Sequence, residues 1–188
     1  MTPTRISERV VVSRDAAATR ALGATLAGAA RPGDLISLVG DLGAGKTQFA
    51  KGFGAGLGIT DTIVSPSFVL MAEYRGRLPL FHVDLYRLAD AVEALAGGLV
   101  DDRQAEGVTL VEWAERLADA LPEARLDVLI DGSGDETRRI TVRPGGAAYD
   151  RYLELVPDAL AAPAQAHASQ PPANGRNRAG VAPTEAGR

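Results

Sequence analysis

A glycine-rich stretch, "LVGDLGAGKTQF" at residues 38–49, constrains the fold of this chain more than any other segment. It fits the pattern G-x-x-x-x-G-K-[ST], with the specified positions occupied by Gly40, Gly45, Lys46 and Thr47. An apolar segment, "DLISLV", precedes the loop and a helix-forming segment follows it. This order of strand, glycine loop and helix is the context that a phosphate-binding loop requires, so the stretch predicts a P-loop.

The chemistry of phosphate binding explains the residue types in this loop. Small residues from Gly43 to Gly45 allow successive backbone N–H groups to converge on phosphate oxygens, and the following helix adds its N-terminal partial charge. Lys46 is expected to reach the β- and γ-phosphates, and the Thr47 hydroxyl to bind Mg²⁺. The chain has 18 arginines and only two lysines, yet one lysine stands where a P-loop needs it. This retained lysine argues against the alternative, a glycine-rich turn without a ligand.

Two predicted strands end in an acidic residue, Asp84 after "LPLFHV" and Glu112 after "VTLV". A P-loop nucleotide needs an acid that holds the Mg²⁺ shell or orients water, usually at the end of a neighbouring strand. Taken singly, each acid is equally well explained as the first solvated residue after a strand. Beside a P-loop, at least one of the two is expected to be functional.

Three further features have competing interpretations. His82 lies two residues before Asp84 and is interpreted as a core residue or as one that supports the site from behind. Trp113, the sole tryptophan, is favoured as a core anchor over a ring beside the nucleotide. The segment "SPSF" at 65–68 is either a proline turn that starts a strand or a switch whose hydroxyls sense the γ-phosphate and Mg²⁺. From the residues alone, the turn is favoured.

Alternating strand and helix patterns predict an α/β fold, and two hairpin candidates make the sheet mixed rather than purely parallel. Ser13 is expected to cap a first helix that runs to about Ala30. The helix after the P-loop contains Gly52, Gly54 and Gly56, which predicts close approach of a neighbouring backbone. Further helices are expected at 90–106, 114–119 and 147–156, and a tight turn at 75–77. The expected strands are "RVVVS", "DLISLV", two within "FVLMAEYRGRLPLFHVDLY", "GVTLVEW", "RLDVLI" and "TRRITVR".

Composition sets the limits of the folded unit and of its partners. The last 32 residues are mostly Ala, Pro and Gly without an aromatic side chain, which predicts a folded domain at 1–156 and a disordered tail at 157–188. The net charge of −4 has the wrong sign for broad binding to a nucleic-acid backbone. The chain has no cysteine and shows neither a secretory signal pattern nor a long apolar run, so a cytoplasmic location is expected.

Several classes of P-loop protein remain open. The only asparagines are Asn174 and Asn177, so the N-K-x-D motif of guanine-specific GTPases is missing. A small-molecule or nucleoside kinase needs an arginine-rich lid, for which "YRGR" and "TRRITVR" are weak candidates. A nucleotide-dependent interaction module that does not hydrolyse ATP is a third possibility. Without a separate substrate domain, the composition favours a compact ATPase whose nucleotide cycle serves a partner.

Four stretches, "GDLGAGKTQF", "SPSF", "FHVDLYRL" and "LVEWAERL", resemble in order and spacing the TsaE (YjeE) family of bacterial P-loop ATPases. The resemblance covers about residues 10–145. It implies a three-layer P-loop NTPase fold with a mixed central sheet, ATP and Mg²⁺ as cofactors, and weak intrinsic ATPase activity. It also implies action with the TsaD and TsaB subunits, which transfer threonylcarbamoyl to a tRNA adenosine next to the anticodon. The ATPase would reset this complex and reach tRNA only through it.

The resemblance also implies roles for individual residues. Asp84 and Glu112 would be catalytic, and Thr47 and Glu112 would hold Mg²⁺. Ser67 stands where the family usually has threonine and keeps a hydroxyl, so that "SPSF" becomes a switch candidate. Arg138 or Arg139 is expected to approach the nucleotide from the late hairpin. The residues expected to bind ATP are Asp41, Leu42, Gly43, Ala44, Gly45, Lys46, Thr47, Ser67 and Asp84.

Overall fold

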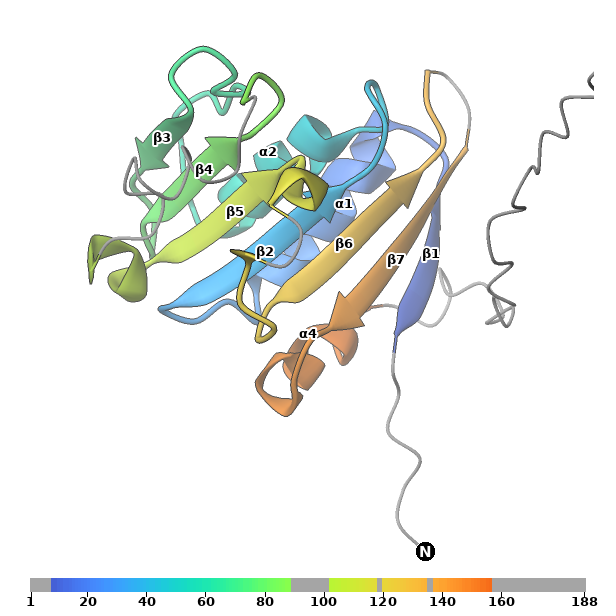
Figure 1. Ribbon diagram of the computed structural model, residues 1–188. Coiled ribbons are helices and arrows are strands. Elements are labelled where there is room, and N and C mark those ends of the chain that lie inside the picture. The colour runs from blue at the N-terminus through green and yellow to red at the C-terminus, as the bar shows by residue number, and fades with distance from the viewer. Residues whose placement is uncertain (1–7, 89–101, 118–119, 135–136, 157–188) are drawn as a thin grey trace, which may run out of the picture.

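The computed structural model describes residues 8–88, 102–117, 120–134 and 137–156 (Figure 1). The strands in these ranges are β1 (Arg9–Ser13), β2 (Asp34–Val39), β3 (Met71–Tyr74), β4 (Leu80–Asp84), β5 (Val108–Glu112), β6 (Leu126–Asp131) and β7 (Arg138–Pro144). The α-helices are α1 (Ala16–Ala27), α2 (Lys46–Gly56) and α4 (Asp150–Leu153), and the 3-10 helices are η1 (Asp102–Glu106), η2 (Ala114–Arg116) and η4 (Ala147–Tyr149).

The strands form one mixed sheet in the order β1-β7-β6-β2-β5-β4-β3. The four central strands β6, β2, β5 and β4 are parallel, whereas β3 pairs with β4, and β7 pairs with both β6 and β1, in antiparallel fashion. The predicted α/β fold with a mixed sheet is therefore confirmed. Because the central strands are parallel, their carboxyl ends meet at one edge of the sheet. The loop after β2 starts at that edge, and Asp84 lies opposite Glu112 in the register of β4 and β5.

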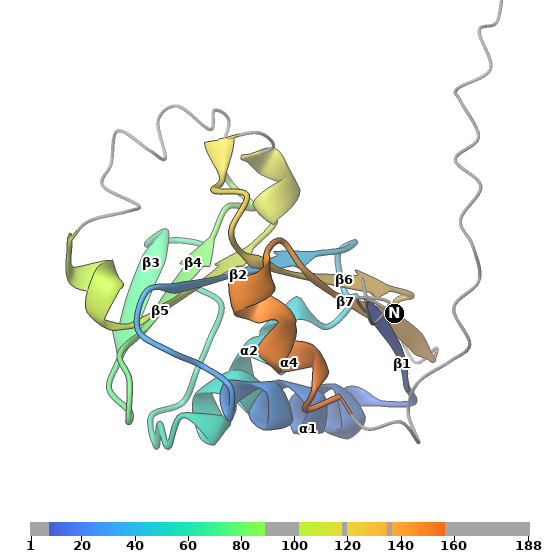
Figure 2. The same ribbon diagram turned by 90° about the horizontal axis from the view of Figure 1, so that it is seen from below.

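Helices α1, α2 and α4 lie on the same face of the sheet (Figure 2). Large apolar side chains on α1 and α2, among them Leu26, Phe49 and Phe53, are fully buried against this face. A smaller apolar cluster on the opposite face joins Val83 and Val111 to Ala114 and to residues after η2. The sheet thus lies between a layer of helices and a thinner layer around η2, as the predicted three-layer arrangement requires.

The glycines of α2 allow it to pack very close to α1. A Cβ atom at Gly52 would overlap the backbone oxygen of Arg20 in α1, and a Cβ atom at Gly23 in α1 would overlap the backbone oxygen of Phe49. The predicted close approach of a neighbouring backbone is therefore present, and α1 is the neighbour. This packing places the N-terminus of α2, where the P-loop ends, against the central strands.

Some expected boundaries were wrong. Asp15, rather than Ser13, caps α1, since its carboxylate accepts a hydrogen bond of 2.7 Å from the backbone N–H of Ala18. The Ser13 side chain is buried and its hydroxyl lies 2.8 Å from that of Thr19 instead. The helix ends at Ala27, three residues earlier than expected, and a turn at Gly28 and Ala29 follows it before "RPGD" leads into β2.

Other segments form shorter elements than expected. The turn between β3 and β4 covers residues 75–79, and the expected helix at 114–119 is only the short η2 within the described residues. The closing helix consists of η4 followed by α4. Most of the segment at 90–106 and the whole tail at 157–188 lie outside the described residues, so the expectations for them stay predictions. No helix in the described ranges is long and apolar enough to cross a membrane.

Candidate nucleotide site

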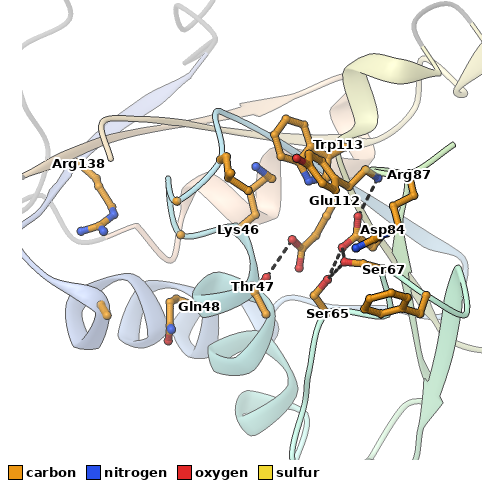
Figure 3. A pocket seen from close by; sticks show the side chains of 16 residues that line it. Lys46, Thr47, Gln48, Ser65, Ser67, Asp84, Arg87, Glu112, Trp113 and Arg138 are labelled. Atoms are coloured by element: carbon orange, nitrogen blue, oxygen red, sulfur yellow. Dashed lines mark hydrogen bonds between the residues drawn. The ribbon is translucent and has the colours of Figure 1, made fainter. Parts of the chain in front are cut away.

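A cavity of about 490 Å³ opens at the edge of the sheet where the parallel strands end (Figure 3). It lies between the P-loop, the "SPSF" segment, the ends of β4 and β5, and the start of β7. Seven of the nine residues expected to bind ATP line it, namely Leu42, Gly43, Gly45, Lys46, Thr47, Ser67 and Asp84. The second expected catalytic acid, Glu112, lines it as well. Asp41 and Ala44 belong to the loop but do not line the cavity.

The P-loop backbone leaves the start of α2 open to an anion. Gly43 and Gly45 have φ angles of 81° and 111°, in the left-handed region that glycine adopts without strain. Gly45 is the N-cap of α2, and no side chain accepts a hydrogen bond there. The first turn of α2 has no acidic residue. The unpaired N–H groups at a helix N-terminus therefore face the cavity, an arrangement that favours phosphate binding.

The side chain of Lys46 is held inside the P-loop by backbone carbonyl groups of the same loop. Its Nζ lies 2.5 Å from the carbonyl oxygen of Gly40 and 2.9 Å from that of Asp41, and it also lies 3.6 Å from the centre of the Trp113 ring. Burial lowers the pKa of Lys46, and the nearby carboxylate of Glu112 opposes this shift. To reach a β- or γ-phosphate, the ammonium must exchange these carbonyl contacts for phosphate oxygens.

Thr47 and Glu112 meet at the floor of the cavity. The Thr47 hydroxyl donates a hydrogen bond of 3.0 Å to Glu112 Oε2, and Glu112 is only 3% exposed. A hydroxyl and a carboxylate are the hard oxygen ligands that Mg²⁺ prefers. In the described ranges no three His, Cys, Asp or Glu side chains form a metal cluster. This donor set fits Mg²⁺, which commonly takes one or two protein ligands and completes its shell with water and phosphate oxygens.

Asp84 lies on the same side of the cavity and binds the "SPSF" segment. Ser65 and Ser67 both hydrogen-bond to Asp84 Oδ2, the Ser67 bond being 2.6 Å long, and Oδ1 accepts a bond of 2.8 Å from the N–H of Tyr86. Burial alone would raise the pKa of Asp84, but the hydrogen bonds from both serines and from the Tyr86 backbone N–H together outweigh it, so the pKa is lowered. The carboxylate is therefore held in its ionised form.

The "SPSF" segment combines both interpretations given to it. It forms a turn, in which the N–H of Leu70 donates to the carbonyl of Pro66, and its hydroxyls also enter the site. Sequence reasoning named Ser67 among the ATP-binding residues and included Ser65 only as part of the switch candidate, although the two serines flank the same proline. Both hydroxyls bond to the same carboxylate, that of Asp84, because of the way this turn lies over β4. The residue pattern alone does not predict that arrangement.

The structure separates the competing interpretations of three other residues. His82 is fully buried, and its Nε2 lies 2.9 Å from Glu112 Oε1, so it is a core residue that contacts a residue of the site. Trp113 packs against the smaller apolar cluster and also lines the cavity, with an uncommon left-handed φ of 61°. Of the two late arginines, Arg138 lines the cavity and donates from Nε to the carbonyl of Ala44 at 2.7 Å.

The family model described as "Threonylcarbamoyl adenosine biosynthesis protein TsaE" matches residues 13–140, a range that includes every residue lining the cavity. The chain belongs to the TsaE family. Membership places it in the biosynthesis of threonylcarbamoyladenosine in tRNA.

Individual relatives agree with this assignment. The tRNA threonylcarbamoyladenosine biosynthesis protein TsaE of Bacillus subtilis is 46% identical over 137 residues, which cover 72% of this chain and 85% of that protein. The protein of the same name from Treponema pallidum is 41% identical over 131 residues, covering 70% of this chain and 97% of the relative. The crystal structure of Bacillus subtilis YdiB superposes with a TM-score of 0.65 at 38% identity, covering 78% of this chain and 92% of that one.

Proposed function

We propose that this TsaE-family chain is a Mg²⁺-dependent ATPase that drives a step of tRNA threonylcarbamoylation. The observation that carries the proposal is the contact between Thr47 and Glu112 at 3.0 Å, directly beside the anion site at the start of α2. It brings a hydroxyl and a carboxylate to the place where a P-loop nucleotide needs its metal. Asp84, on the neighbouring strand, supplies a second carboxylate within the same cavity.

Each group has a distinct task in ATP hydrolysis. The backbone N–H groups from Gly43 to Thr47 hold the phosphates, and Lys46 leaves its carbonyl contacts for the β- and γ-oxygens. Thr47 and Glu112 hold Mg²⁺, which supplies neutralisation of the charge on the phosphate oxygens. Asp84 orients a water molecule toward the γ-phosphorus, and its lowered pKa keeps the carboxylate ionised for this task. Water attacks phosphorus while the bond to the ADP oxygen breaks.

The ATPase acts, in this proposal, on a complex with TsaD and TsaB and reaches tRNA only through that complex. Two large apolar side chains at the cavity mouth, Leu42 and Phe68, are 69% and 85% exposed. Such exposure beside a nucleotide site favours a partner protein that covers it. The net charge of −4 also favours indirect contact with tRNA. The cytoplasm, where tRNA is modified, is the proposed location.

Two variants with one matched control test this function. Lys46→Ala removes the phosphate-binding ammonium and Glu112→Gln removes the charge of the metal ligand, whereas Lys51→Ala removes the only other lysine, on the same helix α2. In a reconstituted threonylcarbamoylation assay, we expect the first two variants to abolish modified tRNA and Lys51→Ala to retain it. Unchanged yield with either site variant contradicts the proposal.

The same assay distinguishes the two alternative functions. An interaction module would work equally well with a non-hydrolysable ATP analogue, and we expect the analogue to fail. A kinase would move phosphate to a metabolite, but its lid candidate "YRGR" lies at the amino end of β4, opposite the cavity. The other candidate contributes Arg138, which is bonded to the P-loop backbone rather than placed on a lid.

A further inference from the structure

His82 is a polar side chain in an apolar place. It lies on β4 two residues before Asp84, is fully buried, and does not line the cavity. Its register partner on β5 is Leu110, and Leu80 precedes it on the same face of the sheet. The proposed mechanism gives this imidazole no contact with nucleotide, metal or water.

The imidazole has one hydrogen-bond partner among the described residues, and that partner is Glu112. Nε2 of His82 lies 2.9 Å from Glu112 Oε1, whereas Nδ1 has no partner in the described part of the chain. An ionised carboxylate can only accept hydrogen bonds. The proton between the two groups therefore belongs to His82 Nε2.

The two oxygens of Glu112 are consequently held from two sides. Oε1 accepts from His82 on β4, and Oε2 accepts from the Thr47 hydroxyl at the start of α2. A carboxylate bonded at both oxygens cannot rotate about its terminal bond without breaking one of these contacts. The direction in which Oε2 faces Thr47 therefore depends on the bond behind it.

An apolar residue at position 82 would fill this space without an unsatisfied buried nitrogen, which costs free energy. The fold alone therefore does not require a histidine here, and its one polar contact leads to Glu112. Residues that orient a metal ligand from behind commonly change metal affinity or activity by about 10–100-fold when they are replaced.

We propose that His82 is a positioning residue whose Nε2–H fixes Glu112 so that Oε2 stays directed at Thr47 and the metal site. The inference rests on the proposed ATPase function, since it assigns Glu112 to Mg²⁺. Loss of the Nε2–H donor frees the carboxylate to rotate and weakens the metal, while the P-loop still holds the phosphates. Metal affinity and kcat therefore fall together, and the affinity for metal-free ATP stays the same.

Two amide substitutions test which ring nitrogen matters. The side-chain amide N–H₂ of glutamine lies about as far from the backbone as Nε2 of histidine and can replace it as a donor to Glu112. The amide N–H₂ of asparagine lies only about as far out as Nδ1. The measurement is Mn²⁺ affinity in the presence of a non-hydrolysable ATP analogue, followed by electron paramagnetic resonance. We expect His82→Gln to stay within about threefold of the wild-type chain and His82→Asn to lose about 10–100-fold. Equal affinities for the two variants overturn the proposal.

The affinity for ATP in EDTA, measured by calorimetry, separates positioning from general damage to the fold. We expect both variants to match the wild-type chain in this measurement. A loss of metal-free ATP affinity in His82→Asn as large as its loss of Mn²⁺ affinity overturns the positioning role.

A second measurement leaves position 82 unchanged. The chain has only two histidines, His82 and His167, so long-range ¹⁵N NMR resolves the buried imidazole once His167→Gln removes the other signal. A proton on His82 Nε2 supports the proposal, and a bare Nε2 overturns it. If the wild-type chain fails to hydrolyse ATP, the proposed function fails, while the Mn²⁺ affinities and the proton position still decide the role of His82.

Discussion

At the scale of single residues, Asp84 is the carboxylate whose state is most clearly set by its neighbours. Two serine hydroxyls and one backbone N–H reach it, and it is only 3% exposed. These donors favour the charged form and hold its pKa below the ordinary value despite burial. The carboxylate therefore stabilises the fold at pH values above its unfolded pKa, and this contribution is lost as the pH falls through the lower, folded pKa.

Removal of both serine hydroxyls leaves burial as the stronger influence on the pKa of Asp84. In the double variant Ser65→Ala with Ser67→Ala, we expect the pKa of Asp84 to rise, because burial remains while two donors are lost. The carboxyl ¹³C shift of Asp84, followed by NMR over a pH series, measures the change. Ser37→Ala is the matched control, since its hydroxyl bonds to Asp127 elsewhere. A pKa that does not move in the double variant contradicts the role given to the serines.

The side chain of Arg138 binds the backbone of the P-loop. Its Nε donates to the carbonyl of Ala44, and in a planar trans peptide the N–H of Gly45 then points the opposite way, toward the cavity. We expect Arg138→Met to weaken ATP binding about tenfold, the usual order for a lost bond from a charged donor. Arg139→Met is the control, because Arg139 faces the other side of β7. Equal ATP affinities of both variants in calorimetry would be incompatible with this role.

At the scale of elements, the contact between α1 and α2 positions the P-loop. Helix propensity alone predicts that Gly52→Ala stabilises the chain by about 1 kcal/mol. The structure predicts the opposite sign, since the new methyl group would overlap the backbone of Arg20, and such overpacking costs about 1–3 kcal/mol. Urea denaturation measures the difference, and Ala55→Gly, at an exposed position of α2, reports propensity alone. A more stable Gly52→Ala variant contradicts the close contact.

Local pattern predicted most elements of the fold but not all of their ends. The spacing of the P-loop and the apolar runs before Asp84 and Glu112 are local signals, so the strands and both acids were placed correctly. Asp15 and Ser13 are both good cap residues, and only the path of β1 into the sheet buries Ser13 and leaves Asp15 to cap. The early end of η2, compared with the helix expected at 114–119, likewise depends on packing rather than on helix propensity.

The parts of the site that pattern missed are contacts between distant segments. Ser65 meets Asp84 across 19 positions, and Arg138 meets Ala44 across 94. Nothing in the local sequence distinguishes Arg138 from Arg139, since the two differ only in the face of β7 to which they point. Such pairings follow from register and turn geometry, which tertiary structure sets.

At the scale of the whole molecule, the two ends of β2 have separate tasks. The P-loop follows its carboxyl end, whereas Asp34 at its amino end binds the C-terminal helix α4 through Arg151 and the hydroxyl of Tyr152. The Arg151 and Asp34 side chains are 15% and 8% exposed. This ion pair binds α4, at the end of the described chain, to the central strand β2.

Breaking this pair is expected to affect stability but not the site. We expect Arg151→Met to lower the free energy of unfolding by on the order of 3 kcal/mol, because Asp34 is left buried without its counter-charge. ATP affinity is expected to stay unchanged. Arg143→Met, which breaks a more exposed pair with Glu8, should cost less than about 1 kcal/mol. Denaturation and calorimetry together test this separation, and a parallel loss of ATP affinity in Arg151→Met would refute it.

The whole chain is proposed to hydrolyse ATP in the service of its partners, and its own turnover reports this most simply. The measurement is the rate of ADP formation by the full chain with Mg²⁺, alone and with purified TsaD and TsaB, with Glu112→Gln as the blank. We expect slow turnover by the chain alone, a clear rise when the partners are added, and neither in the blank. An identical rate with and without TsaD and TsaB, or activity that persists in Glu112→Gln, would contradict a partner-driven ATPase at this site.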